Sequence, residues 1–453
     1  MANPTGPATR SEARTVGAYW LSLQSNLSWA NRRVASASIV DDTHLEWRTS
    51  LDLDISDLRR RALVVGLKVG RSIPVPLATM KKDLQFDLDV MAADGAALSL
   101  LTSDADAHIA HAYFLCQVAE QGIELDDIDD GVITLAHTII RSDDGSNMLR
   151  DLVFDLWAAY QKTSAESPRF VLSDKEVADW YRVMNNAELW KLLQSLASAY
   201  FMIASVPPRG AGSVIKFRVT GKCEPTYGSR SIAALGLRPV RIDLEARGIG
   251  SALREHTLFT APPGTRIAGA SIDTEGDLES DSVMVRRYDE NRVVFYTSRV
   301  PARNHTIHID LVPRLGSFFV PALLCSLLVS VLALGASSLQ IFAHRFTAIQ
   351  DSQLASADGA VAILALVPTI FAVFLVQGGE HRFVYRLQSA PRMLLLLPAT
   401  LLFFCAACVA VSAKSFTLIA MFASTAVVGI ASSLFYALVC QSVRKSLKTA
   451  GSG

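Results

Sequence analysis

The chain has 453 residues, of which 50% are hydrophobic, and its 43 basic and 43 acidic side chains give no net charge. The length exceeds that of one ordinary domain, and the apolar fraction is higher than in most soluble proteins. The balanced charge argues against a nucleic-acid-binding protein, and we predict no such partner.

Residues 1–30 form a polar segment without the apolar stretch of a secretory signal. Of the six cysteines, four lie within long apolar runs. The other two, Cys116 and Cys223, lack the spacing of a disulfide framework. This use of cysteine is typical of a reducing compartment.

An α+β soluble domain is predicted over 31–208, and it begins with strands. Apolar and polar residues alternate over 34–40 and over 45–55, which predicts two half-buried strands. The apolar stretch 62–70 predicts a more buried strand. Residues 84–102 predict a hairpin with an Asp-Gly pair in its turn.

The middle of this domain is predicted to be helical. Apolar residues at helical spacing mark four helices, over 107–122, 147–163, 174–184 and 187–204. Ser103 or Asp104 is expected to cap the first helix, and Ser173 the third. The fourth is apolar almost all round, but Glu188 and Lys191 favour a buried soluble helix over a membrane span.

Residues 209–316 are predicted to form an antiparallel, β-sandwich-like domain, because short strands with turns about every 10 residues fill this region. Only residues 314–317 separate it from the first long apolar run. A movement of this β-rich domain would therefore be transmitted to the helix that follows.

Four apolar runs within residues 317–443 contain no charged side chain and no histidine, and we predict that they form a bundle of four transmembrane helices. They cover about 318–343, 359–379, 393–413 and 415–443. Each reaches the ~20 residues that a helix needs to cross the hydrocarbon layer of a membrane. Residues 444–453 are predicted to be a basic cytoplasmic tail.

Basic residues near the span ends predict the topology. Seven Lys or Arg lie on the side that holds both termini and the loop between the second and third spans, and two lie on the other side. Because excess positive charge in short loops marks the cytoplasm, we predict a multi-pass protein of the cell membrane with both termini cytoplasmic. Membrane lipids are its first expected partners.

The loop before the third span supplies the candidate membrane-interface residues, which are Glu380, His381, Arg382, Arg386 and Arg392. The arginines contribute to the topology and can reach anionic head groups. Pro391 is expected to stand at the start of the third span. Glu380 and His381 are not required by the topology, so they are the candidates for a direct functional role.

Small residues recur at every fourth position of the fourth span and predict a helix-packing face, formed by Thr425, Gly429, Ser433 and Ala437. Packing within one chain and packing in a homo-oligomer are both compatible with it. Polar residues of the first span are candidates for lining a pore or for packing between helices: Ser326, Ser330, Ser337, Ser338 and Gln340.

Asp104, His108 and His111 have the spacing i, i+4, i+7 on a predicted helix, so they are weak candidates for a metal site. The alternative is an ordinary polar face near a helix start, where the dipole favours Asp. The acidic stretch 124–130 does not match a calcium loop and is predicted to be a solvated loop. No catalytic or cofactor-binding motif occurs, so we predict no catalytic residues and no cofactor.

Three stretches carry a likeness to known sequences: VPLATMKKDLQFDLDVMAADGAALSLLT, LFTAPPGTRIAGASI and GGEHRFVYRL. Together they resemble a group of uncharacterised actinobacterial multi-pass membrane proteins with a β-rich soluble region. The resemblance implies a β-rich domain followed by membrane helices, and it implies no activity.

Three hypotheses for function follow. The favoured one is a non-enzymatic membrane protein that presents a cytoplasmic interaction or sensing module to a protein partner. The second is an oligomeric channel or transporter gated by the soluble domain. The third is an enzyme acting on a lipid or envelope precursor.

Overall fold

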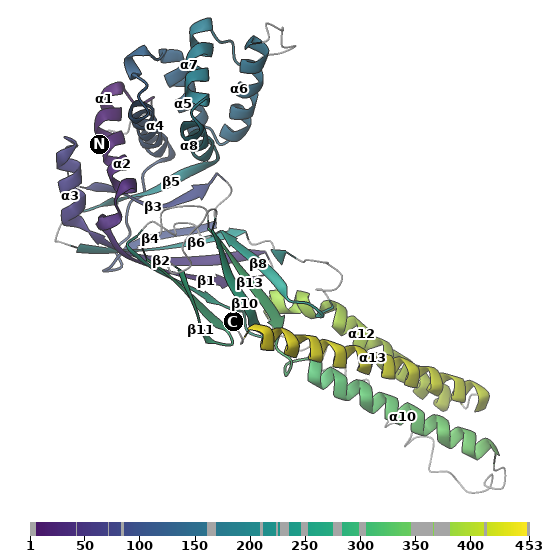
Figure 1. Cartoon of the computed structure of the whole chain (residues 1–453). Helices are drawn as coiled ribbons and strands as arrows, with labels where there is room; N and C mark the ends of the chain where they lie inside the picture. The colour runs from purple at the N-terminus through teal and green to yellow at the C-terminus, as the bar shows by residue number, and fades with distance from the viewer. Residues whose placement is uncertain are drawn as a thin grey trace.

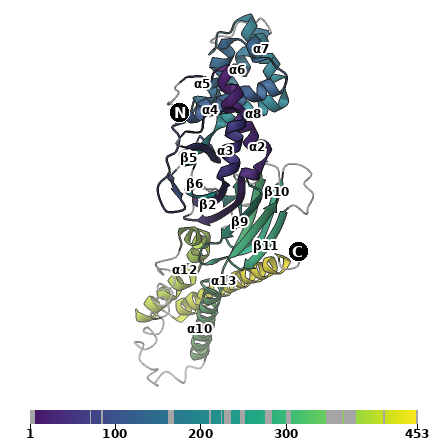
Figure 2. The same ribbon diagram turned by 90° about the vertical axis from the view of Figure 1, so that its left-hand side faces the viewer.

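The computed structural model is a mixed α/β chain in which helices and sheets precede three long apolar helices (Figures 1 and 2). It describes residues 6–41, 43–70, 72–82, 86–160, 169–208, 212–222, 225–226, 235–245, 252–274, 283–298, 305–345, 366, 381–411 and 415–450. A helical lobe, the β-sheets and the three long helices follow one another along the molecule.

The shorter helices precede or interrupt the strands: α1 (Arg10–Glu12), the π-helix η1 (Ala13–Gly17), α2 (Ala18–Ser25), η2 (Leu27–Trp29), α3 (Ile55–Val64), α4 (Ser103–Glu120), η3 (Leu125–Asp127), α5 (Asp130–Arg141), α6 (Gly145–Tyr160), α7 (Asp174–Met184) and α8 (Ala187–Ser198). The strands are β1 (Ala30–Ile39), β2 (His44–Asp54), β3 (Ile73–Lys81), β4 (Phe86–Ala92), β5 (Ala199–Val206), β6 (Gly212–Lys222), β7 (Pro225–Thr226), β8 (Val240–Glu245), β9 (Arg254–Thr260), β10 (Thr265–Thr274), β11 (Val283–Asp289), β12 (Arg292–Ser298) and β13 (His305–Pro313). The long helices are α10 (Phe319–Arg345), α12 (Arg382–Ala410) and α13 (Ser415–Ala450).

The described strands form three sheets. A seven-stranded sheet has the order β11-β12-β9-β1-β2-β6-β4, in which β1 and β9 are parallel and the other neighbours are antiparallel. A four-stranded antiparallel sheet has the order β10-β13-β8-β7, and β3 pairs with β5.

The seven-stranded sheet joins the two predicted soluble domains, so residue 208 does not separate two β units. β2 precedes that residue and β6 follows it, yet the two pair along their whole length, with Leu51 opposite Ile215. β1 likewise pairs with β9. The alternation of residues along a strand shows which face is buried but not which strand lies beside it.

The seven-stranded and four-stranded sheets share one apolar core. Ala37, Phe259 and Phe295 come from the first sheet, and Ile242 and Ile309 come from the second. All five side chains are buried, with every second residue of each strand pointing into this core. The first two turns of α12 pack into the same core.

The strand predicted over 62–70 is wrong, because α3 occupies its first part. Asp54 caps this helix by accepting a hydrogen bond from the Asp57 backbone N–H (3.0 Å). The apolar run includes Leu63 and Val64, but both side chains are exposed at the helix end and do not belong to a core. A short apolar run does not distinguish a helix end from a buried strand.

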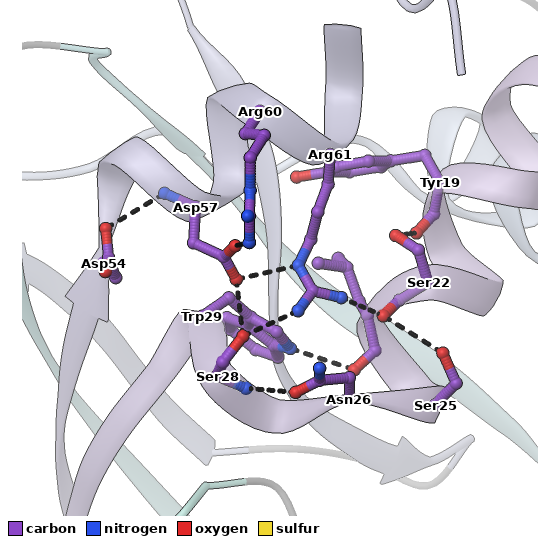
Figure 3. A network of polar contacts seen from close by, with 11 residues as sticks. Tyr19, Ser22, Ser25, Asn26, Ser28, Trp29, Asp54, Asp57, Arg60 and Arg61 are labelled. Carbon is purple, nitrogen blue, oxygen red and sulfur yellow. Dashed lines mark hydrogen bonds and ion pairs between the residues drawn. The ribbon is translucent and has the colours of Figure 1, made fainter. Parts of the chain in front are cut away.

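A polar network fixes α3 against the first helices of the chain (Figure 3). The Asp57 carboxylate accepts hydrogen bonds from Arg61 Nε (2.8 Å) and Ser28 Oγ (2.8 Å), and it also pairs with Arg60. Arg61 donates in addition to Ser28 Oγ and to the backbone carbonyl of Ser22. Asp57 and Arg61 are largely buried, so their charges depend on each other.

Replacing Asp57 with alanine leaves the Arg61 guanidinium buried without its carboxylate. We expect Asp57→Ala to lower the free energy of unfolding by about 3 kcal/mol. Thermal or denaturant unfolding of the full chain measures this loss. Asp127→Ala, which removes an exposed carboxylate, should change stability by less than about 0.5 kcal/mol. An equal effect of the two substitutions would contradict the role of the network.

The helical lobe contains α4 to α8, and its caps differ in part from the prediction. Ser173 caps α7 in a capping box with Glu176, as expected. Thr102, not Ser103 or Asp104, caps α4, because its hydroxyl accepts from the Ala105 N–H.

The helix predicted over 187–204 ends at Ser198, and the chain continues as β5. The backbone of β5 pairs with β3, and this pairing overrides the helical spacing of the apolar residues. α8, at 12 residues, is part of the buried core of the helical lobe, through Leu189 and Leu193 among others.

Three described helices, α10, α12 and α13, are long and apolar enough to cross a membrane. Four spans were predicted; the second, 359–379, lies outside the described residues except for Leu366. α10 and α12 both begin at the sheets and run away from them (Figure 1).

Two boundaries of the long helices differ from the prediction. α12 begins at Arg382 and includes Pro391, so the predicted loop is helical. α13 continues to Ala450, so most of the predicted basic tail is the last part of this helix. Both helices extend beyond their charge-free runs, so such a run marks only the apolar part of the helix.

Candidate functional site

A cavity of about 320 Å³ lies where the start of α4, the end of α5 and strand β5 meet. Most of its wall is apolar, with Leu100, Leu101, Ile140, Tyr200, Met202 and Ile203 among its lining side chains. Lys82, which follows β3, and Asp106 of α4 place two ionisable groups in this wall. An apolar cavity with a few polar groups is the usual form of a small-molecule site.

Asp106 is a buried carboxyl group with one free oxygen. Its Oδ2 accepts a hydrogen bond from the Phe201 backbone N–H (3.1 Å), which fixes the side chain against β5. Its Oδ1 is buried and has no hydrogen-bond partner among the described residues. Burial raises the pKa of Asp106 to about 8, although the Phe201 N–H and the Lys82 charge act in the opposite direction.

Lys82 extends over the end of α5. Its Nζ donates to the backbone carbonyls of Ile140 and Ser142, the latter at 2.8 Å. These contacts satisfy carbonyl groups that a helix end leaves without partners. Burial lowers the pKa of Lys82 to about 8, while the nearby carboxyl groups of Asp143 and Asp106 oppose this shift.

The predicted metal candidates lie on α4, but each is directed to a different partner. Asp104 pairs with Arg141 (2.7 Å), and His108 Nε2 lies 3.3 Å from a carboxylate oxygen of Glu12. His111 Nδ1 accepts from the Ala8 N–H (3.1 Å). Among the described residues, no group of three potential ligands could hold a metal ion.

The two histidines instead hold the N-terminal segment on the helical lobe. His108 Nδ1 is 3.0 Å from the Gly6 carbonyl, beside the bond from Ala8 to His111. Burial lowers the pKa of His111 to about 3, with His137 and His108 adding to the effect, so the ring is neutral and its Nδ1 can accept.

Of the candidate membrane-interface residues, His381 has a structural role that the sequence did not indicate. Its Nδ1 accepts from the Phe383 N–H and caps α12, and its Nε2 lies 3.0 Å from the carbonyl of Ile39 at the end of β1. The side chain therefore connects a long helix to the seven-stranded sheet. Glu380 lies outside the described residues.

The three arginines of this set do not share one environment. Arg382 and Arg386 are exposed, as residues that reach lipid head groups must be. Arg392 is buried: its guanidinium lies over the rings of Phe318 (5.4 Å) and Tyr385 (5.0 Å). The prediction that it faces head groups is wrong, because aromatic rings at the α10–α12 contact enclose it.

The first two turns of α12 belong to the β core. Phe383, Val384 and Leu387 are buried in the cluster that contains both sheets. Val384 packs on Gly264, whose positive φ of 91° forms the turn before β10; a Cβ at that glycine would lie 3.1 Å from a Val384 methyl group. With ~1.5 Å rise per residue, α12 is long enough to enter the sheets and still cross the membrane.

The end of α13 also returns to the sheets. Ser442 Oγ donates to the Leu237 carbonyl (2.6 Å), and Val443 is buried with Val312 of β13. Figure 1 shows the C-terminal end of α13 beside the sheets. Together with the start of α10, three helix ends therefore contact the β part, and we call this region the helix–sheet junction.

The residues of the predicted packing face of α13 contact two different helices, α10 and α12. A Cβ at Gly429 would lie 2.5 Å from Ser330 Oγ, so this glycine allows α13 to approach α10 closely. Thr425 is buried and its Oγ1 lies 3.3 Å from Cys405 Sγ of α12, while Ser433 is also buried. Ala437 is exposed and does not belong to this face.

The serines of α10 mostly pack against other helices. Ser326, Ser330 and Ser337 are buried, and Ser330 Oγ donates to the Ser326 carbonyl (2.7 Å). Ser338 is exposed and Gln340 is partly buried. Their arrangement is that of helix-packing hydroxyl groups more than of a pore lining.

His308 on β13 lies between two carboxylates on the outer face of the four-stranded sheet. Its Nδ1 is 2.6 Å from Asp243 and its Nε2 is 3.0 Å from Asp273. The hydrogen bond with Asp243, helped by Asp273, raises the pKa of His308. The carboxylates lie on opposite sides of the ring, so the cluster stabilises an imidazolium ion and does not form a metal site.

The raised pKa predicts a pH-dependent contribution to stability. It is fully present below the unfolded-state pKa of ~6.5 and is lost as pH rises through the higher folded-state pKa. We therefore expect His308→Gln to lower the melting temperature at pH 6 more than at pH 9. A difference between wild type and variant that does not change with pH would contradict this expectation.

No protein-family model matches the chain, and no curated protein matches it in sequence. The site therefore rests on geometry. Lys82 and Asp106 are not among the candidate residues that the sequence indicates, although Asp104, two residues before Asp106, is one of them. The sequence carried no signal for Asp106, because an acidic residue is ordinary in the first turn of a helix, where Asp104 also lies.

Proposed function

We propose that the chain is a non-enzymatic, multi-pass protein of the cell membrane that holds a sensing or interaction module at the cytoplasmic face. The packing of α12 into the β core carries this proposal, because Phe383, Val384 and Leu387 share one cluster with both sheets. Closely packed cores transmit displacements with little compression. A change in the soluble module would thus reach the helix ends directly.

The other two hypotheses have weaker support. A pore requires polar groups that face an aqueous path, whereas Ser326 and Ser330 are buried and the Ser330 hydroxyl, which lies against Gly429 of α13, donates to a carbonyl of its own helix. An enzyme using His381 requires a ring free to react, whereas both ring nitrogens of His381 are engaged with backbone groups. We therefore propose neither a transport path nor a reaction.

Reconstituted full-length protein tests the function class. We expect it to remain in the vesicle membrane after alkaline carbonate washing and to give no flux of ions or small solutes. Flux that disappears on Ser330→Ala substitution would replace the proposal with a channel. Release of the chain by carbonate would contradict the proposal that the protein spans the membrane.

Cysteine labelling of intact cells tests the orientation. A membrane-impermeant maleimide should label a cysteine placed at Asp351 and should not label one placed at the exposed Ser389. The reverse pattern would invert the topology and place the soluble module outside the cytoplasm. Peptide mapping distinguishes the introduced cysteines from the natural ones.

A further inference from the structure

Residues Gly6–Glu12, which we call the strap, lie on the helical lobe and bury little apolar surface of their own. The strap contains α1, and Ala8 is its only fully buried residue. The chain enters an apolar core only further on, through Tyr19, Trp20 and Leu23. Hydrophobic burial therefore contributes little to holding the strap, and its polar contacts decide how easily it opens.

Arg10 supplies the contacts of the strap that do not involve a histidine. Its guanidinium donates to the carbonyls of Leu125 (2.9 Å) and Ile128 (3.0 Å), and it pairs with Asp130 (2.8 Å). An arginine keeps its charge throughout the pH range in which histidines titrate. These bonds hold the strap in the same way at neutral and at mildly acidic pH.

The remaining contact depends on the protonation state of His111 on α4. Its Nδ1 accepts a hydrogen bond from the Ala8 backbone N–H (3.1 Å), and this nitrogen accepts only while it carries no proton. A proton on Nδ1 would set two N–H groups against each other and place a charge on a ring that is 0% exposed. Release of the strap removes the first penalty and lets water reach the ring.

The neighbours of His111 do not stabilise a charge on it. His137 of α5 lies edge-on to the ring, with the ring centroids 5.3 Å apart, and His108 lies one turn earlier on α4. Burial lowers the pKa of His111 to about 3, and these two histidines add to the effect. Asp104, the nearest acidic residue to His137 and His108 on α4, is engaged with Arg141 (2.7 Å).

His108 forms a contact with the strap that survives in acid. Its Nδ1 lies 3.0 Å from the Gly6 carbonyl, to which a neutral or a charged ring can donate, and its Nε2 lies 3.3 Å from a Glu12 carboxylate oxygen. Burial acts to raise the pKa of Glu12, but hydrogen bonds from Thr9 outweigh it, so the pKa lies below its usual value. Mild acid therefore weakens the strap through His111 and leaves this contact in place.

We propose that the strap is an acid-sensitive element of the helical lobe, which opens when His111 binds a proton and uncovers the face of α4 beneath it. The opening ends at the π-helix η1, because Ala13 and Val16 are buried there and Gly17 lies against Ala112 of α4. The inference rests on the proposed function, since it names a fall in pH as an input to the sensing module.

Hydrogen exchange of the full-length protein in nanodiscs tests the proposal, with rates corrected for the intrinsic effect of pH. The His111 contact is fully present above the released-state pKa of ~6.5 and is lost as pH falls, because only the released ring gains the proton. Protection of the Ala8 amide should therefore fall about fivefold between pH 6 and pH 5. Unchanged protection would overturn the proposal. So would a parallel loss at Ile139 in the core of the lobe, since that means general unfolding.

His111→Gln isolates the effect of the proton. The amide oxygen of glutamine can accept from the Ala8 N–H but does not titrate, so the pH dependence should disappear. His44→Gln, at the start of β2, is the matched control and should retain the wild-type dependence. Arg10→Gln should lower the protection of Ala8 by a similar factor at both pH values. A pH dependence that persists in His111→Gln would overturn the proposal.

A second measurement uses the unsubstituted protein and decides the question even if His111→Gln does not hold the strap at all. In protein labelled selectively in histidine, the NMR signal of the His111 ring should report the gain of a proton in step with the loss of Ala8 protection. A ring that gains the proton while Ala8 stays protected would contradict the coupling. Neither measurement depends on flux or on membrane extraction, so failure here leaves the proposed function class intact.

Discussion

Gly429→Val is expected to separate α13 from α10 and to lower the free energy of unfolding by about 3 kcal/mol. A Cβ at residue 429 would lie 2.5 Å from Ser330 Oγ and 3.3 Å from the Ser326 backbone oxygen. The serine hydroxyl can rotate, but the backbone of α10 cannot yield without moving the helix. Valine adds two further methyl groups to this contact, so relief by a single rotamer change is excluded.

The effect is measured by thermal unfolding and size-exclusion chromatography of detergent-solubilised protein. Gly429→Ala should give an intermediate loss, since its only close side-chain contact is the mobile Ser330 hydroxyl. Gly335→Val is the matched control, because a Cβ at Gly335 on α10 meets nothing within 4 Å. Equal melting temperatures for Gly429→Val and Gly335→Val would show that α10 and α13 do not pack through this glycine.

Gly17→Ala is expected to destabilise the contact between the N-terminal helices and α4, although it adds only one methyl group. A Cβ at residue 17 would lie 2.2 Å from the Ala112 carbonyl oxygen and 2.7 Å from Cys116 Cβ. Both neighbours are part of α4, so the N-terminal helices must shift as a unit. We expect a loss of about 3 kcal/mol in the free energy of unfolding.

Hydrogen exchange locates this loss. The amide of Ala8, which donates to His111 on α4, should exchange faster in Gly17→Ala because the N-terminal segment moves away from the helix. Gly70→Ala is the control, since a Cβ there meets nothing within 4 Å. Unchanged protection of Ala8 together with unchanged stability would contradict the close approach of Gly17 to α4.

Local patterns in the sequence predicted many of the elements. The alternation over 45–55 corresponds to β2, and the alternation over 34–40 lies in the second half of β1. Ser173 caps α7 as predicted, and the structure adds a capping box with Glu176. These features depend on residues close in sequence, so their physical cause is visible without the rest of the chain.

Tertiary partners were not predictable in the same way. The sequence predicts a solvated loop over the acidic stretch 124–130, yet Asp129 caps α5 and Asp179 accepts from the Asp129 N–H. Residues 199–204 have helical spacing but form β5, because β3 offers a pairing edge. No short window of sequence contains these partners.

The candidate site illustrates the same limit. The environment of Asp106 depends on a distant part of the chain. The Phe201 N–H of β5, 95 residues later, donates to Oδ2, and Oδ1 has no hydrogen-bond partner among the described residues. His381 is not required by the topology, and the residue that it contacts, Ile39, lies 342 residues earlier in the chain. The fold shows what these side chains contact, because their partners lie far away in the sequence.

Disulfide cross-linking of the helix–sheet junction tests the central claim that α12 is fixed in the β core. A Cβ at Gly264 would lie 3.7 Å from Val384 Cβ, within the range of a disulfide bond. In native membranes, the Gly264→Cys/Val384→Cys pair should cross-link rapidly under mild oxidation, with the bond identified by peptide mapping. The control pair Gly264→Cys/Tyr385→Cys, which carries the same change at the strained turn but uses an exposed neighbour, should not. Absence of the cross-link in the first pair, or equal cross-linking in both, would contradict the coupling of the soluble module to the membrane helices.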